Sequence, residues 1–457
     1  MTDERDAEFT RRTYVRLAGL AGVAGMTGLA GCSGSGGSGG SDESGGDGGA
    51  EETDTDRIEK VTQTDSGGSG LEIVHWWTAG GEKQALLALL EGFSQEHPEV
   101  ETTNNPAPGG AGSALDTVIR NRVLNENPPS TFQIWPGQSL TPYTEADVLE
   151  PIDDVWSESM RQNYRGGVQD LATAGTGSFV SVPINIHRLN NLFYNVEVVE
   201  SAGVDPTDID DPNQLESALD TVAQETDAVP MAHQTQAPWS TLQLWEDVFV
   251  GTNGVDTYRE VLSGDAGSYE SEIRAALEQV SAYSEYYNGD SGSISWDQAN
   301  AKVVEGDAAF IHQGDWAAGQ YRAADSFEFD ADWGMTPFPG TSGVYHVVTD
   351  SFVFPSSNPS PEATRKFLSY CGTVDAQERF NPVKGSIPPR TDVPTDAFGP
   401  FLQSQIEDFR DSDTQPPTIA HGTGVSPEAK SNIEEAFAGF VESYDVDRTY
   451  RGIRDAF

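Results

Sequence analysis

The stretch Leu71–Glu96 constrains the fold most, because within it the sequence changes from a strand pattern to a helix pattern. The segment LEIVH alternates in the manner of a β-strand, and Trp76-Trp77 and the small-residue turn Thr78–Gly81 follow it. Beyond the turn, apolar residues share one helical face: Leu86, Leu87, Leu90 and Phe93. His97-Pro98 ends the helix. The stretch therefore predicts a strand, an aromatic loop and a helix.

The tryptophan pair Trp76-Trp77 lies between the end of this strand and the start of the helix. Open α/β sheets bind their ligands at such a position. Successive side chains of a strand point to opposite faces, so one face of the sheet cannot bury both rings. The structural alternative places one tryptophan in the core and the other over a loop.

The rest of the chain continues this alternation. The sequence predicts further strands at 100–105, 131–135, 180–184, 192–194, 308–312 and 351–354. It predicts helices at 113–124, 212–225, 239–250, 271–287, 296–304, 361–370, 375–380 and 427–444. Strands that alternate with helices indicate an α/β protein, and no internal repeat is visible.

The first 70 residues are targeting and tether sequence. Arg11-Arg12 precede a weakly apolar run at 17–30, which resembles a twin-arginine export signal over 1–32. The run ends in LAGC, which resembles a lipobox whose cleavage would leave Cys32 lipidated. The alternative, a membrane-spanning helix, is disfavoured because the run is too short for about 30 Å of hydrocarbon. Residues 33–70 are rich in Gly, Ser and acidic residues with almost nothing apolar, which predicts a flexible tether.

The acidic composition excludes a nucleic-acid binder and points to very salty water. The chain has 73 Asp and Glu against 26 Lys and Arg, a net charge of −47, whereas nucleic-acid binding needs a basic surface. At molar salt the Debye length is about 3 Å, so this self-repulsion is screened. The two cysteines, Cys32 and Cys371, support neither a disulfide framework nor a cysteine metal site. Zinc-ligand spacings, a nucleophile elbow, a Walker loop and a dinucleotide fingerprint are absent from the sequence.

Several segments after Gly70 resemble, in this order, the extracellular solute-binding proteins of ABC sugar importers, most closely the glucose/mannose-binding branch. They are LEIVHWW, NPPSTFQIWPG, VPINIHRLNNLFYN, SWDQANAKVVEGDAAFIHQGDWAAG, TPFPGTSGVYHVVTDSFVFP, NPVKGSIPPR and AHGTG. The resemblance implies a two-lobe, type II periplasmic-binding-protein-like α/β fold. Its hinge would have three chain crossings, with the ligand in the cleft. The expected first lobe is 71–183 plus 310–349, and the second is 184–309 plus 350–457.

Residues suited to a sugar pocket recur at predicted strand ends and loops. Such a pocket needs aromatic faces for the C–H faces of the ring and charged or planar groups for its hydroxyls. The candidates are Trp76, Trp77, Gln133, Trp135, Trp296, Asp315, Trp316, Asp350, Lys384 and His421. Lys384 is notable because lysine is much rarer than arginine in this chain. The alternatives are a core role for Trp296 and Trp316, a helix cap for Asp315, a loop contact for His421 and a solvated surface position for Lys384.

The resemblance assigns sugar contacts to a specific set of these residues. They are Trp76, Trp77, Glu82, Gln133, Trp296, Asp350, Lys384 and His421. Two departures bear on the identity of the sugar. Trp135 stands where the branch carries a histidine, and the turn Thr78–Gly81 is one residue longer.

The targeting motifs and the resemblance together predict an exported, lipid-anchored, monomeric receptor that captures a monosaccharide, with glucose favoured by the resemblance, by closing its lobes. It would deliver the sugar to a membrane permease that a separate ATPase drives, without catalysis, cofactor or metal. The alternatives are a receptor for an oligosaccharide and a secreted glycosidase that uses a pair of its many carboxylates.

Overall fold

The structure, a computed structural model, describes residues 70–78, 80–107 and 113–457. The predicted export signal with Arg11 and Arg12, the lipidation site Cys32 and the tether at 33–70 lie outside these residues, apart from Gly70. Within them, strands and helices alternate as the sequence predicts.

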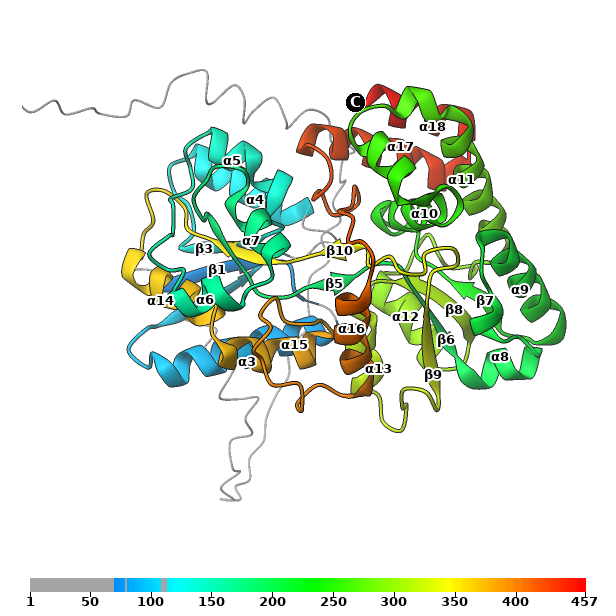
Figure 1. Cartoon of the computed structure of the whole chain (residues 1–457), viewed down its shortest axis with the longest axis horizontal. Helices are drawn as coiled ribbons and strands as arrows, with labels where there is room; N and C mark the ends of the chain where they lie inside the picture. The colour runs from blue at the N-terminus through cyan, green and yellow to red at the C-terminus, as the bar shows by residue number, and fades with distance from the viewer. Residues whose placement is uncertain (1–69, 79, 108–112) are drawn as a thin grey trace, which may run out of the picture. The chain divides into compact units, whose positions relative to one another are not determined.

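A five-stranded sheet forms the centre of the first lobe (Figure 1). Its order is β2 (Thr102–Pro106), β1 (Leu71–His75), β3 (Thr131–Ile134), β11 (Ser351–Val353) and β4 (Ser181–Pro183). Strand β1 runs parallel to β2 and β3, whereas β11 runs antiparallel to β3 and β4. The first lobe is therefore completed by a strand from the last quarter of the chain.

Helices cover this sheet and bury an aromatic core. They are α3 (Gly80–Glu96), α4 (Ser113–Leu124), α5 (Thr141–Glu145), α6 (Glu158–Asn163), α7 (Gly166–Thr173), α14 (Pro361–Cys371) and α15 (Val374–Lys384). Phe93 of α3 packs against Phe367 and Tyr370 of α14, with ring centroids 5.3 and 5.8 Å apart. Cys371 is fully buried in the same core, as expected for a structural cysteine.

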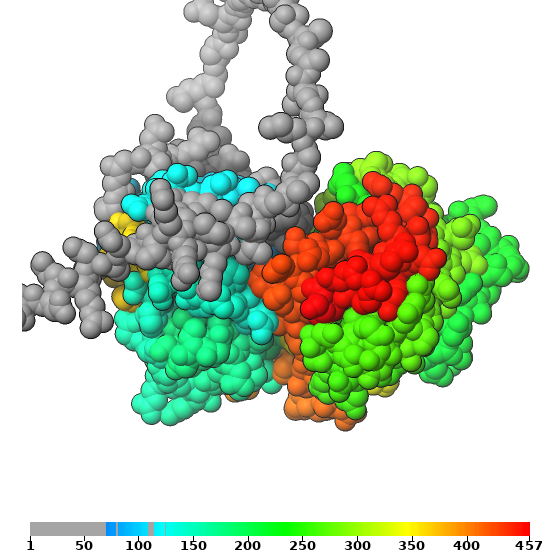
Figure 2. Space-filling model, turned by 90° about the horizontal axis from the view of Figure 1, so that it is seen from above, coloured from blue at the N-terminus to red at the C-terminus, as the bar shows by residue number. Residues whose placement is uncertain are grey.

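The second lobe contains a four-stranded sheet. Its order is β7 (Val229–Ala232), β8 (Ala308–Gln313), β6 (Asn191–Asn195) and β9 (Trp333–Pro337). Its helices are α8 (Val196–Ala202), α9 (Pro212–Glu225), α10 (Trp239–Leu262), α11 (Glu270–Tyr283), α12 (Trp296–Val304), α13 (Ala317–Ala323), α16 (Pro400–Asp411), α17 (Pro427–Ser443) and α18 (Val446–Asp455). Figure 2 shows the C-terminal residues, in red, on the surface of this lobe.

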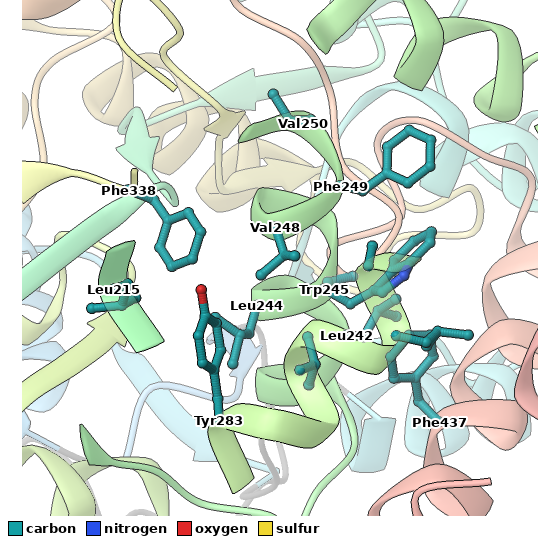
Figure 3. Close-up of a cluster of buried hydrophobic side chains, with 14 of the residues drawn as sticks. Leu215, Leu242, Leu244, Trp245, Val248, Phe249, Val250, Tyr283, Phe338 and Phe437 are labelled. Carbon is teal, nitrogen blue, oxygen red and sulfur yellow. The ribbon is translucent and has the colours of Figure 1, made fainter. Parts of the chain in front are cut away.

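Helix α10 is the centre of the second lobe's core (Figure 3). Trp245 packs against Phe249 one turn later and against Phe437 of α17, both with centroids 5.6 Å apart. Tyr283 of α11 is buried in the same cluster, and its hydroxyl donates to the Pro212 carbonyl at the start of α9. Residues 239–250 of α10 are all buried, so this helix cannot shift without disturbing the lobe.

The chain passes between the lobes three times. The first passage lies between β4 and β6, and the second lies between β9 and β11. These two passages pair antiparallel as a short sheet of β5 (His187–Arg188) and β10 (Val347–Val348). The third passage follows Arg390, which pairs with Tyr164. A two-lobe α/β fold of type II with three crossings is therefore confirmed.

The strand pairings correct the expected lobe boundaries. Strand β8 pairs with β6 and β7, so the segment from 310 to β9 belongs with the second sheet, whereas the first lobe was expected. Strand β11 pairs with β3 and β4, and α15 packs on α3, so 351–384 belongs with the first sheet. Local patterns predicted the strands of the first sheet together with β6 and β8, but missed β5, β7, β9 and β10. They also carry no information about which sheet a strand joins.

Candidate functional site

A pocket of about 210 Å³ is lined by residues from both lobes and from the hinge. Six tryptophans line it: Trp76, Trp77 and Trp135 from the first lobe and Trp239, Trp296 and Trp316 from the second. The other lining residues are Thr78, Glu82, His187, Ser295, Asp297, Val348, Asp350, Lys384 and His421. Aromatic walls thus enclose a few charged and polar groups, the usual composition of a small-molecule site.

The tryptophan pair divides between the pocket and the core. Trp77 is 1% exposed and packs against Phe352 and Phe380, at 5.8 and 5.0 Å, while one part of it reaches the pocket. Trp76 is half-buried, and its ring lies edge-on to Trp135 at 5.1 Å. The alternation of a strand therefore holds at its end, because the two rings point in different directions.

A buried ion pair lies at one end of the pocket. Lys384 Nζ is 2.8 Å from Glu82 Oε1, and Lys384 is 2% exposed. Glu82 lies in the first turn of α3 and Lys384 in the last turn of α15, so both helix dipoles favour these charges. Burial raises the pKa of Glu82, although the charge of Lys384 opposes this rise. Lys384 also lies over the ring of Trp316, with Nζ 5.8 Å from the centroid.

Asp350 accepts hydrogen bonds from two side-chain amides and lies close to two basic groups. Gln133 Nε2 donates to its Oδ1 at 3.0 Å, and Asn185 Nδ2 donates to its Oδ2 at 2.7 Å. Burial alone would raise the pKa of Asp350, but His187 and the charge of Lys384 outweigh burial and lower it to about 2. The carboxylate is thus charged at neutral pH although it is 4% exposed.

His187 connects the hinge to both lobes. Its Nδ1 bonds Asp315 of the second lobe, and its Nε2 lies 3.6 Å from Asp350. The Asn185 amide nitrogen is 3.0 Å from the same Nε2. Burial and Lys384 also lower the pKa of His187, but Asp315 and Asp350 outweigh these effects and raise it.

His421 is enclosed by aromatic rings. Trp135, Trp239 and Trp316 surround it at centroid distances of 5.1, 6.2 and 5.7 Å. Burial, and next the charge of Lys430, lower its pKa to about 3, so the ring is neutral at pH 7. Its Nδ1 is buried and has no hydrogen-bond partner among the described residues. A ligand hydroxyl would satisfy this nitrogen.

The structure brings together nearly all of the candidates. Trp76, Trp77, Glu82, Trp135, Trp296, Trp316, Asp350, Lys384 and His421 all line the pocket. Gln133 does not, because its side chain bonds Asp350 and the Trp76 backbone N–H instead. Asp315 is fully buried behind the pocket, where it accepts from the Arg188 backbone N–H and from His187, so it supports a lining residue.

Sequence reasoning missed several lining residues, chiefly His187, Trp239 and Asp297. His187 lies within the segment VPINIHR and Asp297 within SWDQ, so both were visible only as parts of motifs. Trp239 is the first residue of α10, and no local sequence pattern marks it as a pocket residue. Its position in the pocket follows from its packing with Ala237 and Trp316 in one cluster.

Comparison with known proteins identifies the family. Residues 79–378 match the family model described as "Bacterial extracellular solute-binding protein". The chain belongs to this family. The recognition of a solute-binding protein from sequence segments is therefore confirmed. In the described part of this solute-binding protein, no helix has the length and apolarity needed to cross a membrane.

The relatives of this solute-binding protein include characterised and uncharacterised receptors. The xylose/arabinose-binding protein XacG of Haloferax volcanii is 39% identical over 388 residues, 84% of each chain. An uncharacterised ABC transporter extracellular-binding protein of Pyrococcus horikoshii is 37% identical, covering 84% of this chain and 87% of the relative. The bacterial solute receptor AcbH, whose structure is described with a preference for β-D-galactopyranose, shares the fold. Its TM-score is 0.72 at 16% identity, covering 85% of this chain and 98% of AcbH.

Proposed function

We propose that this solute-binding protein captures a monosaccharide in the pocket between its lobes and delivers it to the permease of an ABC importer. One observation carries the proposal: six tryptophans surround a pocket whose polar groups include Asp350, Lys384 and His421. Tryptophan faces suit the C–H faces of a sugar ring, and charged groups make strong hydrogen bonds to its hydroxyls.

The polar groups have hydrogen-bonding capacity left for a sugar. Each oxygen of Asp350 accepts one amide hydrogen bond, and a carboxylate oxygen has two lone pairs, so each can accept one hydroxyl as well. Lys384 has three donors, of which Glu82 takes one. His421 offers its unpartnered Nδ1. A sugar that lost one of these contacts would leave a buried group unpaired, which gives selectivity.

An aldopentose is the first candidate ligand, and glucose is the second. The name of the Haloferax relative, a xylose/arabinose-binding protein, supports a pentose. Trp135 also supports it, because an indole in place of the branch's imidazole fills more of the pocket and offers a donor but no acceptor nitrogen. The motifs shared with the glucose/mannose-binding branch keep glucose as the alternative.

The mechanism follows from the two-lobe site. A ligand that contacts both lobes binds the closed form better and shifts the population toward it. The closed form then docks on the permease, and the sugar leaves unchanged. We further propose that the protein is exported through Arg11 and Arg12 and anchored as a monomer through a lipid on Cys32.

Calorimetric titration tests the proposal. The protein, in molar KCl, is titrated with D-xylose, L-arabinose, D-glucose, D-galactose and maltose, and the sugars are analysed afterwards. We expect tight binding of one monosaccharide, which is recovered intact. Cleavage of maltose would instead indicate a glycosidase, and tight binding of maltose alone would indicate an oligosaccharide receptor. Absence of binding across the panel would contradict the proposed ligand class.

A further inference from the structure

A cluster of buried ionisable residues lies in the second lobe, outside the pocket lining. Glu246 and Asp247 of α10, Tyr258, His312 and His346 are each at most 2% exposed. None of them lines the pocket. Buried charges are costly unless they are paired and hydrogen-bonded, so the partners of this cluster indicate what it holds in place.

Glu246 binds the backbone of the segment that precedes His421. Its Oε1 accepts from the Ile419 N–H at 2.5 Å and from the Tyr258 hydroxyl, and its Oε2 accepts from the Ala420 N–H at 3.1 Å. The carboxylate therefore accepts hydrogen bonds from two consecutive backbone N–H groups. Neither residue lies in a helix or a strand, so neither N–H is paired within a regular element.

His346 binds the same segment at Pro417, before the two residues that Glu246 binds. Its Nδ1 is 2.7 Å from Asp247 Oδ1, and its Nε2 is 3.2 Å from the Pro417 carbonyl. Both neighbours are acceptors, so both ring nitrogens carry hydrogen and the ring is an imidazolium. The other oxygen of Asp247 accepts from His312 at 2.7 Å.

These bonds fix the segment 417–420 at three peptide groups, and the next residue, His421, enters the pocket. Within the turn, the His421 N–H donates to Thr418 Oγ1 at 3.2 Å, and the Gly422 N–H donates to the Ile419 carbonyl at 2.8 Å. Two further bonds flank the segment: the Val347 N–H donates to the Pro416 carbonyl at 3.1 Å, and Ser139 Oγ donates to the Gly422 carbonyl at 3.0 Å. A tight turn of this kind moves as a unit, so its anchors determine the position of the His421 ring.

We propose that Glu246 and His346 are positioning residues of the ligand site, which hold the backbone of 417–420 and thereby place His421 in the pocket. His346 also directly precedes β10, whose Val348 lines the pocket, so the same residue joins the hinge strand to the turn. The inference rests on the proposed function, because His421 is taken to contact the ligand.

The substitution Glu246→Gln tests it. The new amide keeps the shape of the side chain but replaces one acceptor oxygen with a donor, so a peptide N–H of the turn loses its partner. We expect the Kd for D-xylose, or for the sugar of the panel that the wild type binds, to rise about tenfold, equivalent to about 1.4 kcal/mol. The matched control is Tyr258→Phe, which removes a hydrogen bond to the same carboxylate but leaves both turn contacts; its Kd should stay within about twofold of the wild type.

A double-mutant cycle with His421→Ala separates positioning from general destabilisation. If Glu246 acts through His421, Glu246→Gln adds nothing to the loss caused by His421→Ala. An additive loss in the double mutant, or an unchanged Kd in Glu246→Gln, overturns the proposal. If Glu246→Gln does not fold, His346→Asn replaces it, since the shorter side chain retains the contact with Asp247 and loses the one with Pro417.

Amide hydrogen exchange at Ile419 and Ala420 gives a readout that needs no sugar. Faster exchange at these two amides in Glu246→Gln, but not in Tyr258→Phe, supports the anchoring of the turn. If the wild type binds no sugar while this exchange pattern is found, the proposed ligand class fails and the anchoring stands. Unchanged exchange at both amides overturns the anchoring whatever the sugar result.

Discussion

A buried ion pair at the pocket and an ion pair on the surface differ in how much they contribute to stability and binding. Lys384 and Lys366 both pair with a glutamate, but Lys384 is 2% exposed whereas Lys366 is 41% exposed. Solvent screens the surface pair and leaves it little net effect, while the buried pair retains most of its interaction. The same kind of contact therefore leads to opposite expectations at the two sites.

Lys384→Met should abolish sugar binding, raising the Kd at least about 100-fold, since it removes a charged donor from the pocket. It should also lower the free energy of unfolding by about 3 kcal/mol, because Glu82 stays buried without its partner. Lys366→Met should change neither quantity measurably. Calorimetry and guanidinium unfolding measure both, and normal binding by Lys384→Met would contradict the assignment of the site.

Buried neutral histidines should make the protein sensitive to mild acid. Burial lowers the pKa of His233 to about 3, and that of His75 to about 4. An unfolded histidine has a pKa of about 6.5, so below that pH the unfolded chain binds protons that the native chain does not. Stability is therefore full above pH 6.5 and falls as the pH decreases toward these folded values.

His233→Gln should flatten this pH dependence. Between pH 6.5 and 5 each such histidine costs about 2 kcal/mol, so the variant should lose about that much less stability over this interval than the wild type. The comparison of slopes is unaffected by a uniform loss from the removed contact with Thr241. Unfolding curves in molar salt at several pH values give both slopes, and identical slopes would refute the titration of His233.

At the scale of elements, the end of α15 fits closely against α13. Gly385 ends α15 with φ +83°, and a Cβ there would lie 2.9 Å from the Asp315 carbonyl oxygen. Gly319 of α13 also faces the carbonyls of Val383 and Lys384 at 3.2 Å from an added Cβ. This close backbone contact fixes the end of α15 and therefore the position from which the Lys384 side chain reaches the pocket.

Gly385→Ala should cost more than the left-handed conformation alone. Gly203→Ala is the matched control, because Gly203 ends α8 with φ +71° and an added Cβ would meet nothing within 4 Å. The control should lose about 1 kcal/mol of stability, whereas Gly385→Ala should lose about 2–4 kcal/mol and weaken sugar binding by moving Lys384. Equal losses in the two variants would show that the close contact contributes nothing.

Elements with strong local signals were predictable, whereas their assembly was not. Helices α9 and α12 begin and end where the sequence places them, because Asp211 and the Ser295–Gln298 capping box mark their starts. Helices α16 and α18 were missed; in α18 only Thr449, Tyr450 and Ile453 are buried. The site residues came from motifs, but Trp239 joins them through contacts between distant segments that no local pattern encodes.

At the scale of the whole molecule, the net negative charge destabilises the folded state unless salt screens it. With a net charge of −47, the native chain should repel itself at low ionic strength, where the Debye length reaches about 30 Å at 0.01 M. The Tm should rise steeply between 0.1 and 2 M KCl. Sucrose at matched osmolality should produce a much smaller rise, because it does not screen charge. An equal effect of sucrose and KCl would attribute the salt requirement to solvent exclusion instead.

The order of strands in the first sheet has a consequence for synthesis. Strand β11 sits between β3 and β4, although more than 160 residues separate it from β4 along the chain. A ribosome must therefore have made three-quarters of the protein before this sheet can close, and the second lobe still awaits α17 and α18. A chain that terminated before β11 would therefore leave both lobes unfinished and open to proteases.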